Sequence, residues 1–120
     1  MTKAQKIRNE RIKAININLE KQAQKVFDWI LDLIDADTKN KNYLPIELYI
    51  FNEKGSVKFI AANAKNNEYS FDKQLIFCDI LKFVTKLKDV IEKEEGFYVF
   101  IEPDIYFGYS QNIILKVFIK

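Results

Sequence analysis

The side chains that carry most nucleophilic, proton-transferring and zinc-binding chemistry are almost absent from this sequence. It contains no histidine and a single cysteine, Cys78. These two residue types do most of that chemistry at neutral pH. Cys78 lies in an apolar stretch, so we expect a buried structural thiol within a helix, with no base to activate it. The sequence therefore predicts a protein that is not an enzyme, with no catalytic residue, cofactor or metal site.

Acidic residues and glycines do not form a site by their spacing either. Asp28, Asp32 and Asp35 recur at i, i+4 and i+7, which places them on one helical face. A hard cation needs more oxygen ligands than one exposed helix face offers. The three glycines are isolated from one another, so they form no phosphate-binding loop. We expect the aspartates to form a solvated face.

Basic residues are concentrated at the N-terminus. Residues 1–26 hold seven basic residues against two acidic ones, a net charge of +5, whereas the remainder has a net charge of −3. Positive charge at a helix N-terminus is disfavoured by the helix dipole, so a role in binding phosphates would explain it. The alternative is a solvated helix whose lysines reflect codon usage, since the chain has 17 Lys and only two Arg. That usage is typical of an AT-rich gene from a bacterium or a phage.

Aromatic residues are concentrated near the C-terminus. On a strand that starts at Phe97, side-chain alternation points Tyr98 and Phe100 away from Val99. One of these two faces must be core. Rings on the other face could stack on bases or anchor a protein partner. The alternative is a second face that another part of the chain covers.

A long N-terminal helix follows from apolar residues spaced by three or four. Thr2 is the expected N-cap, and the helix is predicted to run to about Asp37. The stripe begins at Ile12, so residues 1–11 are expected to project from the core or fray, and a break at residues 16–18 is the alternative. Ile7 and Ile17 lie off the stripe and should be exposed. The stripe consists of Ile12, Ile15, Leu19, Ala23, Val26, Ile30 and Leu33.

The remaining elements predict an α+β two-layer sandwich in one domain, residues 1–120. Strands are expected at 44–51 and 56–62, then a polar loop at 63–69 and a helix capped by Ser70 and stopped at Gly96. Further strands are expected at 97–101, 113–120 and, as a short strand, 105–109. The order is α-β-β-α-β-(β)-β, and hairpins favour an antiparallel sheet of four to five strands with two helices.

These features favour a protein that works by binding, in the cytoplasm. In size, lack of catalytic motifs and AT-rich codon usage the chain resembles small phage or mobile-element proteins that inhibit a host machine, including inhibitors of CRISPR effectors. We therefore expect a non-catalytic inhibitor or adaptor that docks on a protein or nucleoprotein. The alternative is direct nucleic-acid binding through the basic helix, and a homodimer is left open. No membrane partner is expected. The predicted contact residues are Lys3, Lys6, Arg8, Arg11, Lys13, Ile17, Tyr98 and Phe100.

Overall fold

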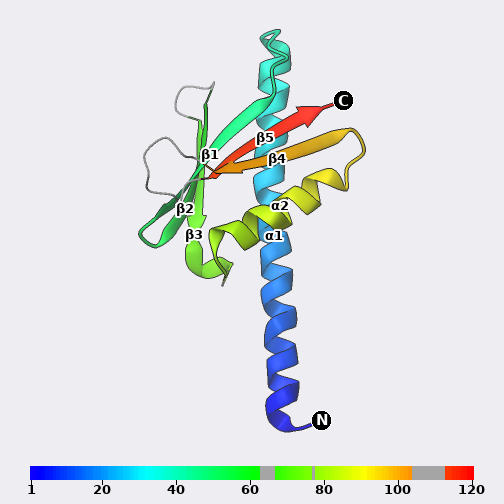
Figure 1. The fold of residues 1–120 in the computed structure, drawn as a ribbon, viewed down its shortest axis with the longest axis vertical. Coiled ribbons are helices and arrows are strands. Elements are labelled where there is room, and N and C mark those ends of the chain that lie inside the picture. The colour runs from blue at the N-terminus through cyan, green and yellow to red at the C-terminus, as the bar shows by residue number, and fades with distance from the viewer. Residues whose placement is uncertain (63–66, 77, 104–112) are drawn as a thin grey trace.

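Two helices cover one face of an antiparallel sheet in the computed structural model, which describes residues 1–62, 67–76, 78–103 and 113–120 (Figure 1). The predicted α+β class, with a five-stranded antiparallel sheet and two helices, is confirmed for these residues. The predicted strand at 105–109 lies outside them. The elements in chain order are α1 (Lys3–Lys39), β1 (Ile46–Glu53), β2 (Ser56–Ala61), β3 (Glu68–Asp72), the 3-10 turn η1 (Lys73–Leu75), α2 (Ile80–Glu92), β4 (Phe97–Pro103) and β5 (Ile113–Ile119).

The sheet has β1 at its centre and the order β3-β2-β1-β5-β4. Strands β1 and β2 form a hairpin in which Glu53 pairs with Ser56, and Gly55 takes a φ of +80° that a residue with a Cβ rarely adopts. The C-terminal strand β5 lies between β1 and β4 and pairs with both. The N-terminal and C-terminal halves of the chain therefore share one continuous sheet.

The core lies between the helices and the sheet face that they cover. Alternate residues of each strand point into it, as the two-residue period requires. Phe59 is fully buried and contacts three other aromatic rings: Phe71, Phe83 of α2 and Trp29 of α1. These contacts join both helices to the sheet. The fully buried strand residues are Leu48, Ile50, Val57, Phe59 and Leu115.

The second helix begins later than the sequence predicted. Ser70 lies in β3 opposite Lys58, so the prediction that it caps a helix was wrong, as was the placement of Glu68 and Tyr69 in a loop. The capping signal in this region serves a shorter turn: Asp72 accepts a hydrogen bond from Gln74 N at the start of η1. Pairing with β2 satisfies the backbone hydrogen-bonding groups of residues 68–72. The residue types alone did not predict this pairing.

The true start of α2 is set by Asp79, whose carboxylate accepts a hydrogen bond from Lys82 N at 2.8 Å. Cys78 therefore precedes the helix and is half-buried, so its predicted burial within a helix was wrong. The helix ends at Glu92 with Lys93 as its C-cap, so the prediction that Gly96 stops it was wrong. Gly96 has a φ of +96° and lies in the turn that leads into β4.

Helix α1 is continuous from Lys3 to Lys39, so the break considered at residues 16–18 does not occur. At about 1.5 Å per residue, 37 residues span about 55 Å, close to the molecule's longest dimension of 58 Å. The N-terminal half of α1 projects beyond the rest of the molecule (Figure 1). No helix within the described residues is long and apolar enough to cross a membrane.

Candidate interaction surfaces

The projecting part of α1, residues 3–18, is called the arm below. Each of its residues is exposed except Ile15, which is half-buried, and the first fully packed residue is Leu19. The expected overhang of residues 1–11 is confirmed, but it is longer than the apolar stripe indicated. Ile12 is 50% exposed because α2 and the sheet end before they reach it. The arm spans about 24 Å.

A capping box starts the arm. The Thr2 hydroxyl accepts a hydrogen bond from Gln5 N at 3.1 Å, and the Gln5 side chain accepts one from Thr2 N at 2.9 Å. The predicted N-cap is thus confirmed, and the box satisfies two backbone donors that would otherwise lack intrahelical partners. The first turn carries no acidic residue, so nothing there offsets its positive charges.

The five predicted cations of the arm divide between two opposite faces. The arginine face, comprising Ala4, Ile7, Arg8, Arg11 and Ile12, lines one shallow depression. Arg8 and Ile12 continue the buried stripe toward the N-terminus, whereas Ile7 lies off it. The lysine face lies on the other side, where residues spaced by three and four share one surface: Lys3, Lys6, Glu10, Lys13 and Ile17. Within the part of the chain that the structure describes, none of the five cations forms a salt bridge.

The arm also exposes apolar side chains. Ile7 is 49% and Ile17 is 57% exposed, as predicted from their positions off the stripe. Sequence reasoning missed Ile12, because periodicity places it on the core side and cannot show where the body ends. The exposure of Ile12 depends on tertiary structure. A helical stripe shows which face of the helix is buried but not the length over which another element covers it.

The other two predicted contact residues lie on a separate surface. Tyr98 and Phe100 of β4 point away from the helices and are 40% and 58% exposed. The Phe100 ring meets Phe118 of β5 edge-on at 5.2 Å, and Lys120 Nζ lies 5.2 Å from the centre of the Tyr98 ring. The eight predicted residues therefore form two surfaces, the arm and the helix-free face of the sheet.

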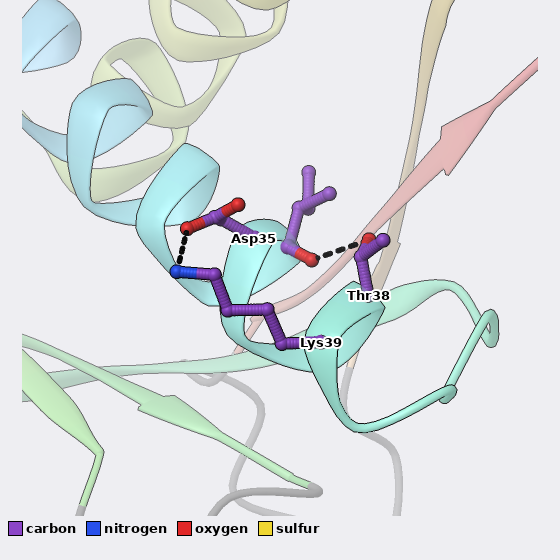
Figure 2. A network of polar contacts seen from close by, with 4 residues as sticks. Asp35, Thr38 and Lys39 are labelled. Carbon is purple, nitrogen blue, oxygen red and sulfur yellow. Dashed lines mark hydrogen bonds and ion pairs between the residues drawn. The ribbon is translucent and has the colours of Figure 1, made fainter.

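Asp28, Asp32 and Asp35 of α1 are exposed, and two of them are engaged within their own helix. Gln24 Nε2 donates a hydrogen bond to Asp28 Oδ1 at 3.1 Å, and Lys39 Nζ lies 3.1 Å from Asp35 Oδ2. Figure 2 shows the latter pair beside the Thr38 hydroxyl, which donates to the Ile34 carbonyl oxygen. No group of three or more acidic residues or cysteines that could hold a metal ion occurs among the described residues.

Cys78 is half-buried just before the start of α2. Partial burial raises the pKa of the thiol above its usual value, and Asp79 adds to this, whereas Lys82 acts in the opposite direction. A thiol with a raised pKa is a poor nucleophile near neutral pH.

A pocket of about 290 Å³ at the C-terminal end of α1 was not predicted. It lies between the end of α1, the connector to β1 and the end of β5, and its walls include Ile34, Leu44, Pro45 and Phe118. Tyr43, which is 77% exposed, stands at the same place. The only sequence signal was the pair of apolar residues, Tyr43 and Leu44, after a polar connector.

The chain is similar to the uncharacterized protein MJ0213 of Methanocaldococcus jannaschii, with 33% identity over 100 residues. The match covers 72% of this chain and 66% of the relative, slightly less than two thirds of the relative's length. No family model matches the sequence, and no solved structure matches the chain.

Proposed function

We propose that this protein is a non-catalytic interaction protein of the cytoplasm, an adaptor or inhibitor whose arm docks on a partner protein or nucleoprotein. The exposure of the arm supports this proposal. A lone helix of about 12–15 residues is marginally stable in water, because most helical stability comes from packing one face against another element. The arm has such a face and no described element covers it, so a partner would supply the missing contacts.

The arginine face is the part of the arm best suited to docking. It combines Ile7 and Ile12 with Arg8 and Arg11, which are the only arginines of the chain. Arginine is enriched in interfaces and lysine is depleted, because the guanidinium group pairs with carboxylates in a fixed geometry and is weakly hydrated. A helix that lies in a groove typically presents contact residues at i, i+3, i+4 and i+7. Counted from Ala4, these positions hold Ile7, Arg8 and Arg11, so this face combines apolar and cationic contacts. The partner we propose presents an apolar groove with an acidic rim.

The absence of a catalytic set supports a binding role. The sequence has no histidine, and burial raises the pKa of the single thiol, which disfavours the reactive thiolate.

Direct nucleic-acid binding is a second candidate, favoured by the five arm cations that have no salt-bridge partner among the described residues. Such binding would weaken with salt, with a logarithmic slope of about −0.9 for each phosphate neutralised on duplex DNA. A protein partner held largely by apolar and bidentate contacts should show a shallower slope.

The test is capture of partners from a lysate of the source cell by tagged full-length protein, with and without nuclease. The arm variant is Arg8→Glu/Arg11→Glu, and the matched control, Lys41→Glu/Lys54→Glu, makes the same charge change in two exposed body positions. Ile17→Asp and Tyr98→Ala probe the lysine face and the sheet. Urea unfolding of each variant confirms folding.

We expect the arm variant to lose at least about tenfold in partner affinity, equivalent to about 1.4 kcal/mol, while the control retains it. A partner that disappears with nuclease, together with a steep salt slope, would favour the nucleic-acid candidate. Full capture by the folded arm variant would contradict docking through the arginine face.

A further inference from the structure

One exposed face runs along the whole length of α1. The lysine face of the arm continues toward the C-terminus in alternating steps of four and three. Every residue on this line is exposed, including Leu31, which is 38% exposed. The line is called the outer face below, and it lies opposite the buried stripe. Beyond Ile17 it comprises Lys21, Gln24, Asp28, Leu31 and Asp35.

Charge on the outer face changes sign along the helix. Lys6 and Lys13 lie in the N-terminal half, whereas Asp28 and Asp35 lie in the C-terminal half. This is the reverse of the arrangement that a helix dipole favours, so an isolated copy of α1 gains nothing from it. A second helix with the same charge distribution, packed antiparallel to the first, would place positive charge against negative charge at both ends.

We propose that the outer face of α1 binds the outer face of a second copy of this chain, antiparallel, to form a two-fold symmetric dimer. One register pairs most of the charges: it places Lys6 opposite Asp35 of the second copy and Lys13 opposite Asp28, and it leaves Lys21 beside the same residue of the second copy at the two-fold axis. Two-fold symmetry repeats each pair, which gives four ion pairs. In the same register the two-fold axis passes near residues 20 and 21, close to the middle of α1, so the two helices overlap along almost their whole length.

In the same register Ile17 lies opposite Gln24 of the second copy and Leu31 lies opposite Glu10, so the register is set by the ion pairs and not by apolar contacts. Two helices in contact over about 55 Å, along a strip about 10 Å wide, bury about 1,100 Å² in total. Stable interfaces start at about 1,200 Å², so a reversible dimer with a dissociation constant in the micromolar range is expected.

The dimer requires no rearrangement of the body. The outer face is opposite the stripe that packs on α2 and the sheet, so the two bodies lie on the far sides of the helix pair. The Asp35–Lys39 pair on this face is solvent-exposed, and exposed pairs exchange partners at little cost (Figure 2). The arginine face stays open, so this inference is independent of the proposed function.

The test is sedimentation equilibrium of the full chain from about 5 to 200 µM, at low salt and at about 0.5 M salt, because screening weakens exposed ion pairs. We expect a monomer–dimer equilibrium that weakens with salt. Lys6→Glu/Lys13→Glu and Asp28→Lys/Asp35→Lys should each raise the dissociation constant by at least about tenfold. The combined four-residue swap should restore it, because every opposite-charge pair is re-formed.

The matched control is Arg8→Glu/Arg11→Glu, which makes the same charge change on the opposite face and should alter the dissociation constant by less than about threefold. Its loss of partner capture, with dimerisation intact, would separate this inference from the proposed function. A monomer at every concentration in low salt would overturn the dimer. A combined swap that stays as weak as the two double variants, with folding intact, would overturn the antiparallel register.

Discussion

Replacing Ala14 with proline should unfold most of the arm without affecting the body. Proline inside a helix removes one backbone hydrogen bond, clashes with the preceding turn and costs about 3 kcal/mol. At position 14 the chain can avoid this cost by releasing residues 3–13, because proline is tolerated at the first position of a helix. The released segment cannot re-form a stable helix by itself, since 11 residues are too few in water.

The magnitude follows from the helix lengths. Helices α1 and α2 contain 37 and 13 residues, so residues 3–13 are about a fifth of their helical content. The far-ultraviolet circular dichroism signal of the helices should fall by about that fraction. The free energy of unfolding should change by less than about 0.5 kcal/mol, because Ala14 is exposed and full packing begins only at Leu19.

The assay is circular dichroism with urea unfolding, in dilute protein and high salt so that self-association does not contribute. Ala23→Pro is the matched control: Ala23 is on the same helix but fully buried, and the substitution should cost at least about 3 kcal/mol. A loss of more than about 1 kcal/mol in Ala14→Pro would refute the reasoning, because it would show that the arm stabilises the body.

Two further predictions concern the core and the thiol. Phe83→Ala should cost about 3–5 kcal/mol in urea unfolding, because Phe83 is fully buried against Phe59 and Phe71 and its loss leaves a cavity; an effect below about 1 kcal/mol would contradict this packing. Cys78 in the folded protein should be alkylated with a pH midpoint above that of the urea-unfolded chain, because burial raises the pKa of the thiol. The contribution of the neutral thiol to the free energy of unfolding is fully present below the pKa of Cys78 in the unfolded chain. It is lost as pH rises through the pKa of Cys78 in the folded protein. Equal midpoints in the folded and unfolded chains would contradict this.

The sequence by itself determined the features that depend on local periodicity and on turn chemistry. The spacing of three and four between Leu19 and Leu33 specified the buried face of α1, and Thr2 specified where that helix begins. The strand predicted at 44–51 forms at Ile46–Glu53, the strand predicted at 97–101 forms within Phe97–Pro103, and Gly55 lies in the predicted hairpin turn. These signals are local, since each residue type restricts its own backbone or shows its own face to the core.

Tertiary structure decided what depends on neighbours distant in sequence. Residues 68–72 form a strand because they pair with the edge of β2, although Ser70 and Asp72 are residue types that commonly cap helices. The exposure of Ile12 depends on where α2 and the sheet end, which no feature of α1 encodes. The same holds for the candidate surfaces: the sequence showed which residues are basic, but only the fold separated the arm from the face that bears Tyr98 and Phe100. The residue pattern of a helix or strand shows which of its faces is apolar. The packing of other elements decides how much of that face is buried.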